Sequence, residues 1–282
     1  MLNFTKTLYM GSAKSEGGGT PSPVDKTKYN ITIDSIVGDV NDSGVLQAPT
    51  GPTDLVFTGV KEVATGALSY GFYHGKITSA SFPDLISMNN NNSMDYVFSS
   101  NPNLTKVLFP ELLEINSNNQ YMIQSCPLLN EVSFSKLVTI GSSTNLSYLC
   151  MNSTALEEIS FPVLKNLLSG YCMSYAFSGT NLSKVYFTSL DNINANRAFY
   201  AMFNGAQKLA NIYFNSLKTT SFGSYAGQFS NMFDGSAGQT SGAITMHFPS
   251  NLEAKVQTLT GYPNFGATSG RLTLAYDLPA TE

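Results

Sequence analysis

The sequence predicts a repeat solenoid, a rod of stacked coils with parallel β-strands along one face. The first observation is a phenylalanine that recurs at intervals of 25 to 27 residues, with one interval of 34, at Phe57, Phe82, Phe109, Phe134, Phe161, Phe187, Phe214 and Phe248. The second is a leucine three residues after most of them, at Leu85, Leu112, Leu137, Leu164, Leu190 and Leu217. Apolar columns in register at a fixed period indicate units that stack and share one core.

Each unit follows the pattern L-x-x-V-x-F-P-x-L-x-x-I, as in "LTKVLFPELLEI". The alternation V-x-F predicts a short strand with one face inward, and the proline that often follows lacks the amide to continue it. A second apolar cluster, such as "YVFSSNPNL", predicts a turn of helix or irregular coil on the opposite side. About eight units stacked roughly 4.8 Å apart form a sheet roughly 35 Å long.

The unit length, the F-P-x-L turn and the aromatic residue ahead of a small polar run resemble BspA-type leucine-rich repeat proteins. The resemblance covers residues 54–252 and implies a curved leucine-rich-repeat rod. Members of that family are mostly surface or adhesive proteins of host-associated bacteria, and similar repeats occur in their phages. The proline is missing after Phe134, Phe187 and Phe214, and a solenoid fold does not by itself fix a function.

The sequence divides into four parts. Residues 1–28 form an N-terminal anchor strand and a Gly/Ser/Pro linker, and residues 29–53 form a small β cap. Residues 54–252 form the leucine-rich repeat solenoid, and residues 253–282 form a C-terminal cap in which the repeat register is lost. The assembly anchor is predicted from apolar residues that alternate with polar ones, at Leu2, Phe4, Leu8 and Met10. Such a strand can pair with another chain, whereas the alternative is a frayed terminus or a strand folded back on its own cap.

The composition argues against several classes of protein. Charged residues make up 12% of the chain, about half the usual share of roughly 25%. The net charge of −4 gives neither the basic footprint of a nucleic-acid binder nor a basic face for a membrane. No apolar run approaches the roughly 20 residues of a membrane span, and the first residues do not resemble a secretory signal.

No catalytic, cofactor or metal site is predicted. The two histidines, His74 and His247, are far apart in the stack, and neither adjoins a nucleophile and an acid in sequence. The cysteines, Cys126, Cys150 and Cys172, are odd in number and lack a C-x-x-C pair. They therefore indicate neither a disulfide nor a zinc site. Cys150 occupies the position that Phe98, Ile123 and Phe203 hold in other units, which predicts a buried small hydrophobe.

A loop at residues 39–44 resembles the start of a calcium loop, with Asp39, Asn41, Ser43 and Gly44 in the pattern D-x-N-x-S-G. The twelfth position, which should carry an acidic ligand, is Thr50. An Asx-rich turn is the favoured interpretation, and calcium binding stays an open alternative.

The outward positions of the strands carry the candidate binding residues. One row reads Ser81, Leu108, Ser133, Ser160, Tyr186, Tyr213 and His247, and the other reads Ser79, Lys106, Glu131, Glu158, Lys184, Asn211 and Thr245. Tyr186, Tyr213 and His247 predict an aromatic patch for a sugar ring or a protein partner, with Leu108 further along the row. The alternative is that tyrosine simply favours strands. Lys106 with Glu131, and Glu158 with Lys184, are expected to be opposite-charge neighbours.

These observations predict a non-enzymatic virion structural protein of a gut-bacterial phage, made in the host cytoplasm. It would be displayed on the head or tail as a fibre, decoration or host-binding adhesin. Its expected partners are other virion subunits or a scaffold protein through the N-terminal segment, a host surface glycan or protein, and further copies of itself. Nucleic acid and a membrane span are not expected. The alternative is a bacterial cell-surface leucine-rich-repeat adhesin.

Overall fold

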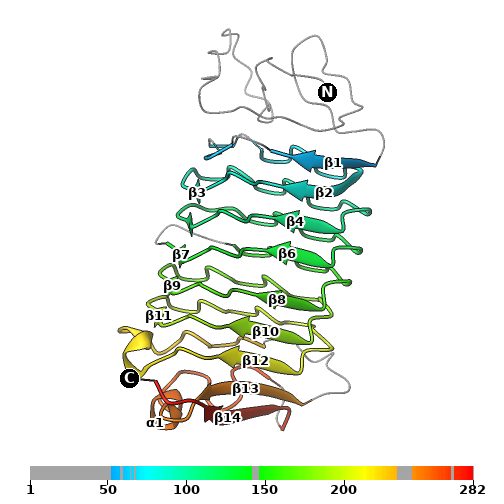
Figure 1. Cartoon of the computed structure of the whole chain (residues 1–282). Helices are drawn as coiled ribbons and strands as arrows, with labels where there is room; N and C mark the ends of the chain where they lie inside the picture. Colours follow the sequence, from blue (N-terminus) through cyan, green and yellow to red (C-terminus); the bar gives the residue numbers. More distant parts are fainter. Residues whose placement is uncertain are drawn as a thin grey trace, which may run out of the picture.

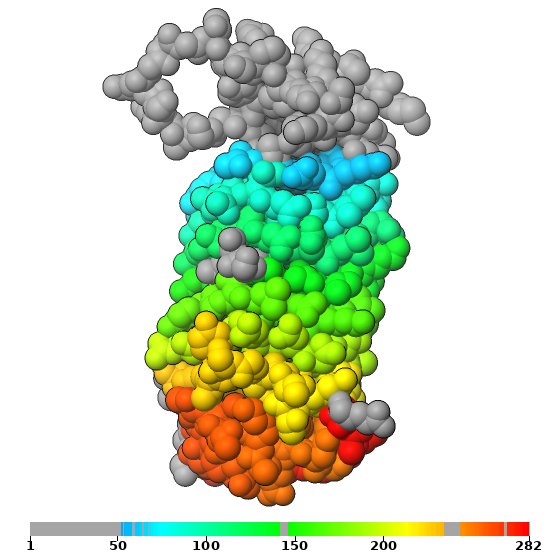
Figure 2. All heavy atoms as spheres, turned by 90° about the vertical axis from the view of Figure 1, so that its left-hand side faces the viewer, coloured from blue at the N-terminus to red at the C-terminus, as the bar shows by residue number. Residues whose placement is uncertain are grey.

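The chain winds into a solenoid of parallel β-strands in a computed structural model (Figure 1). The structure describes residues 52–57, 60–63, 65–66, 68–141, 146–233, 243–267 and 270–281. The predicted anchor and linker, nearly all of the predicted cap at residues 29–53 and the loop at residues 39–44 lie outside these residues. Figure 2, viewed from the left-hand side of Figure 1, shows the described coils stacked in chain order.

Within the described residues, the predicted strand face carries nine strands that all run parallel. Four belong to one hydrogen-bonded sheet: β1 (Thr53–Val56), β2 (Ile77–Ser81), β4 (Lys106–Leu108) and β6 (Glu131–Ser133). Five belong to a second sheet that continues the stack: β8 (Glu158–Ser160), β10 (Lys184–Phe187), β12 (Asn211–Phe214), β13 (Ile244–Pro249) and β14 (Leu272–Leu278). The fold is therefore the predicted repeat solenoid, with parallel strands on one face.

The phenylalanine column forms the centre of the core, as the repeat pattern predicts. Consecutive rings stack with centroids 4.2 to 5.9 Å apart and planes within 14° of parallel. The apolar residues two positions before each phenylalanine are buried as well. Among them, Val107 lies in register with Val132, and Val185 with Ile212. Because each ring contacts the ring of the next coil, every unit completes the core of its neighbours.

The repeat register continues beyond residue 252, the end of the solenoid predicted from the sequence. Strand β14 pairs with β13, and Leu274 lies beside Met246. The ring of Tyr276 stacks on Phe248 with centroids 5.9 Å apart. The C-terminal cap therefore adds one more strand in the same register, with a tyrosine in place of the phenylalanine and no F-P-x-L turn after it.

A narrower parallel sheet lies on another side of the coils and is formed by the last apolar residue of each unit. Its strands are β3 (Ser87–Met88), β5 (Glu114–Ile115), β7 (Thr139–Ile140), β9 (Asn166–Leu167) and β11 (Asn192–Ile193). The second residue of each strand is buried. The repeat pattern marks these positions as apolar, but two-residue strands are too short to be seen as alternation.

The side predicted as helix or irregular coil is a regular ladder of turns. Alternate amides donate to the next coil, as from Tyr70 to the Asp95 carbonyl at 2.8 Å. The amides between them donate within the turn, as from Tyr73 to the Tyr70 carbonyl at 3.2 Å. Short helical segments occur at η1 (Thr219–Phe222) and α1 (Glu253–Val256). No helix among the described residues has the length and apolar character of a membrane span.

A tyrosine ladder, formed by Tyr70, Tyr96, Tyr121, Tyr148 and Tyr175, runs along these turns. Its consecutive rings stack with centroids 4.3 to 5.0 Å apart. All five residues have positive φ, between 52° and 60°. Cys150 is buried, as predicted, and Cys126 and Cys172 are buried as well.

Candidate binding site on the strand face

The three aromatic residues predicted to form a patch lie in one continuous stack. Tyr186 on β10 faces Tyr213 on β12 with ring centroids 5.0 Å apart and planes 7° from parallel. Tyr213 faces His247 on β13 at 4.4 Å and 9°. Parallel pairing of these strands in register places the three side chains side by side. The predicted proximity of these residues is therefore correct.

Polar contacts fix the His247 end of the stack. Its Nδ1 lies 2.9 Å from a carboxylate oxygen of Asp277 on β14, and its Nε2 lies 3.1 Å from Oδ1 of Asn211 on β12. The sequence did not identify Asp277 as a partner, because the aspartate lies beyond the last recognised repeat. Both ring nitrogens of His247 face structural partners in neighbouring strands.

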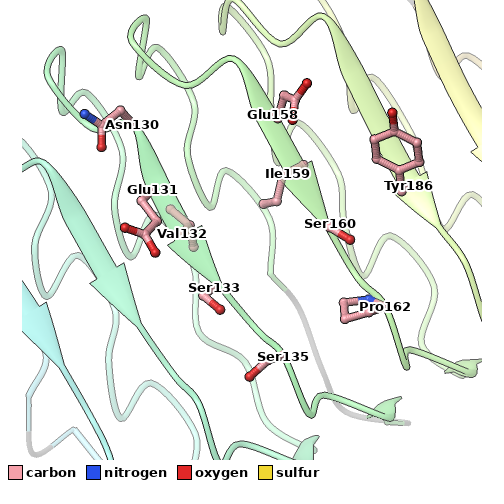
Figure 3. A pocket seen from close by; sticks show the side chains of 10 residues that line it. All are labelled: Asn130, Glu131, Val132, Ser133, Ser135, Glu158, Ile159, Ser160, Pro162 and Tyr186. Atoms are coloured by element: carbon pink, nitrogen blue, oxygen red, sulfur yellow. The ribbon is translucent and has the colours of Figure 1, made fainter.

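The face of the Tyr186 ring that points towards β8 is not covered by another aromatic ring of the described residues. Tyr213 is covered on both sides, by Tyr186 and by His247. The strand neighbour of Tyr186 on its other side is Ser160 of β8, whose side chain is short. Figure 3 shows the Tyr186 ring standing on β10 beside Ser160 and Glu158.

The strand face is interrupted between β6 and β8. At the neighbouring steps, the Phe109 amide donates to the Ser133 carbonyl and the Phe161 amide to the Tyr186 carbonyl, both at 3.0 Å. The equivalent bond from the Phe134 amide to the Ser160 carbonyl is not formed, and β6 and β8 belong to different sheets.

The interruption is confined to the strand face and slightly widens the core beneath it. The rings of Phe134 and Phe161 are 5.9 Å apart, the largest spacing between consecutive phenylalanines of the column. On the other side of the same coils, β7 and β9 remain paired through Thr139 and Asn166. The coils therefore stay stacked while their outer strands separate.

A groove of about 460 Å³ lies over this interruption (Figure 3). It is lined by Asn130, Glu131, Val132, Ser133, Ser135, Glu158, Ile159, Ser160, Pro162 and Tyr186. In the row of outward side chains, two serines, Ser133 and Ser160, stand between Leu108 and Tyr186. Tyr186 is recognisable in the sequence as a candidate binding residue, whereas the groove beside it is not.

The row of outward side chains that contains Lys106 and Lys184 has two glutamates in succession between these lysines. Lys106 is in register with Glu131, and Lys184 with Glu158, as predicted, so the two glutamates flank the interruption. Within the described part of the chain, ion pairs under 4 Å join Lys136 to Glu111 and His247 to Asp277, and neither predicted pair is among them. Like charges on adjacent strands disfavour close pairing, which agrees with the separation of β6 and β8.

The remaining candidate residues lie apart from the groove. Leu108 is half-buried on β4, in register with Ser133 and one strand beyond the groove lining. His74 contacts the ring of Tyr73 in the ladder of turns. Leu2, Phe4, Leu8 and Met10 lie outside the described residues. The described ranges contain no group of three or more His, Cys, Asp or Glu residues placed to hold a metal ion.

The chain is similar to solved structures of a leucine-rich repeat protein and of a vaccine antigen. A leucine-rich repeat protein from Bacteroides ovatus is 16% identical, with 87% of this chain and 76% of that chain covered and a TM-score of 0.26. The pneumococcal vaccine antigen PcpA is 10% identical, with 89% and 84% covered and a TM-score of 0.25. No family model matches the chain, and no curated protein matches its sequence. The repeated motif and the stacked parallel strands are features of BspA-type leucine-rich repeat proteins, which the sequence resembles.

Proposed function

We propose that this chain is a non-enzymatic, adhesin-like binding protein that presents its strand face to a partner. The observation that carries the proposal is the groove between β6 and β8, where an open tyrosine face adjoins serine, asparagine and glutamate side chains. These groups project from strands of a packed solenoid, so their positions are fixed before a ligand arrives. Preorganised polar and aromatic groups in a concave surface are typical of binding sites.

Binding is favoured over catalysis by the chemistry of these groups. Nucleophilic catalysis requires a hydroxyl or thiol in contact with a base that a third group orients. His247 instead lies between Asp277 and Asn211 and stacks on Tyr213. The three cysteines are buried in the core, and none of them lines the groove between β6 and β8.

For the place of display, we favour the virion of a gut-bacterial phage, with the solenoid on the head or tail and the protein made in the host cytoplasm. The support comes from the sequence: the alternating segment at Leu2, Phe4, Leu8 and Met10, the linker after it, and a polar surface with few charges. The second candidate is a bacterial cell-surface adhesin, which the resemblance to BspA-type repeats favours equally. Antibodies against the chain separate the two, because they would label purified phage particles in the first case and intact bacteria in the second.

Binding is tested with the fluorescently labelled full chain on cells of the bacterium that carries the gene or is infected by the phage. Replacing Tyr186 and Tyr213 together by alanine should weaken cell binding about tenfold or more, as expected for central aromatic residues of an interface. Tyr148→Ala in the tyrosine ladder is the matched control, because it also removes a stacked tyrosine but away from the strands. If the wild-type chain does not bind these cells, or if the folded double variant binds undiminished, the proposed use of the strand face is wrong.

A further inference from the structure

We infer that the groove between β6 and β8 binds a neutral oligosaccharide, with one sugar ring stacked on the open face of Tyr186. This inference rests on the proposed binding function and names the class of ligand for the same face. It also assigns different roles within the aromatic stack: Tyr186 contacts the ligand, whereas Tyr213 and His247 support it from behind.

The stacking geometry is the first reason. An aromatic ring carries partial negative charge on its face, and the C–H groups on one side of a sugar ring are apolar and slightly positive. A tyrosine offers such a face only where no other ring covers it. Tyr213, which is itself backed by His247, covers one face of the Tyr186 ring. The short side chain of Ser160 leaves the other face of Tyr186 open to the groove.

The polar groups around that ring are the second reason. Each sugar hydroxyl both donates and accepts, so a saccharide site needs donors and acceptors close together. The groove supplies the hydroxyls of Ser133, Ser135 and Ser160, the amide of Asn130 and the carboxylates of two glutamates.

The interrupted ladder adds backbone groups to this set. The Ser160 carbonyl does not receive the Phe134 amide, and the Asn130 carbonyl does not receive the Glu157 amide. At the next step along the chain the equivalent bond is present, from the Ser183 amide to the Glu157 carbonyl at 2.8 Å. Strand groups without strand partners bind water or a ligand instead.

Charge decides between a neutral saccharide and a basic peptide. The row across the interruption reads Lys106, Glu131, Glu158 and Lys184, with each glutamate next to a lysine in register. The two lysines offset the two carboxylates, so the row is neutral as a whole. The groove itself is lined by the two glutamates, and the lysines stand in register on the next strands outward. A neutral ligand can use the carboxylates as hydrogen-bond acceptors, whereas a cationic peptide that extends beyond the groove would also meet the lysines.

The size of the groove agrees with a short saccharide segment. Its volume of about 460 Å³ lies within the range of about 300 to 1,000 Å³ found for small-ligand sites. The groove is bounded by side chains of β6, β8 and β10 and lies on the outer surface of the solenoid (Figure 3). It therefore suits part of a longer chain that passes over the sheet.

The test applies the full chain to an array of immobilised neutral and acidic oligosaccharides and, separately, to a lysine- and arginine-rich peptide. We expect binding to neutral oligosaccharides, a loss of at least tenfold in affinity for Tyr186→Ala, and retention within about threefold for Tyr186→Phe, which keeps the ring. Raising NaCl from 50 to 500 mM should change the affinity less than twofold. Tyr148→Ala should bind as the wild type does, and a thermal melt should show that each variant is folded.

Three outcomes would overturn the inference: a preference for the basic peptide with strong salt dependence, a preference for acidic saccharides, or undiminished saccharide binding by folded Tyr186→Ala. If the wild-type chain binds cells but none of the neutral oligosaccharides, the ligand class is wrong and the proposed binding function stands. If it binds neither, the proposed function fails as well.

Discussion

Phe161 lies between two rings of its own kind in the middle of the phenylalanine column. Its centroid is 5.9 Å from that of Phe134 and 5.5 Å from that of Phe187, and its side chain is fully buried. Phe161→Ala should lower the free energy of unfolding by about 3 to 5 kcal/mol, because it leaves a cavity that both neighbouring coils line. Chemical denaturation measures the change, with Phe161→Leu as the milder control at about 1 kcal/mol. An unchanged melting temperature would contradict the proposed column.

The buried thiols allow a second prediction for single residues. Burial raises the pKa of Cys126 and of Cys172 to about 12, and the pKa of Cys150 well above its usual value of 9.0. The pKa values are higher in the folded than in the unfolded chain. The contribution of the thiols to the free energy of unfolding is therefore fully present below pH 9 and declines as the pH rises towards 12. The native protein should not react with a thiol reagent at pH 8, and three thiols should react after unfolding in guanidinium. Rapid reaction of the native protein would show that these side chains are not buried.

Among the structural elements, the separation of β6 from β8 should be visible in amide hydrogen exchange. The Phe109 and Phe161 amides donate to the neighbouring strand, whereas the Phe134 amide at the equivalent position does not. The Phe134 amide should therefore exchange at least tenfold faster than the other two, which serve as internal controls in the same molecule. Equal protection at the three positions would mean that the two strands are paired in solution.

The turns depend on glycines that leave room for the neighbouring coil. Gly179 has φ of +67°, and a Cβ there would lie 2.3 Å from Oδ1 of Asn152. Gly66 has the same φ, but no atom lies within 4 Å of its Cβ position. Both substitutions to alanine carry the cost of a positive φ, about 1 kcal/mol, and only Gly179→Ala adds the clash. The Asn152 amide must shift to admit the Cβ, so denaturation should show a loss for Gly179→Ala at least as large as that for Gly66→Ala, and a smaller loss would contradict the close contact between coils.

Elements with a strict period could be predicted from the sequence, and those without one could not. The phenylalanine and valine columns identify strands such as β10 and β12, because burial imposes the same residue type in every coil. The interruption cannot be predicted, since Glu131–Ser133 and Glu158–Ser160 match the strand pattern as well as any other unit. The groove thus depends on a missing hydrogen-bonded step. The like charges of Glu131 and Glu158 agree with that step, but two outward carboxylates on adjacent strands do not by themselves predict a break. Asp277 was missed for another reason, because the chain around it replaces the repeated phenylalanine with Tyr276.

At the scale of the whole molecule, the ends of the strand stack are the places where another chain could pair with the sheet. A parallel sheet must end in strands with one unpaired edge, and an unpaired edge attracts other chains. Strand β14 forms the C-terminal edge and is held to the stack by the His247–Asp277 pair and by Tyr276 on Phe248. These contacts anchor the last coil, and the groove lies between the fourth and fifth strands of the face, away from both ends.

The segment at residues 1–10 leads to the last prediction, which concerns how the protein joins an assembly. In sequence, Leu2, Phe4, Leu8 and Met10 alternate with polar residues ahead of a linker of roughly 18 residues, with an expected span of about 20 to 25 Å. Such a strand can add to the sheet of another subunit while the solenoid projects away. Deleting residues 1–12 should leave the melting temperature and the saccharide binding unchanged but abolish incorporation into the particle or attachment to the cell surface. Replacing Leu2, Phe4 and Leu8 by serine, which keeps the length, should have the same effect. If the truncated protein still incorporates, the segment is not an anchor, and if it loses its thermal stability, the segment belongs to the solenoid.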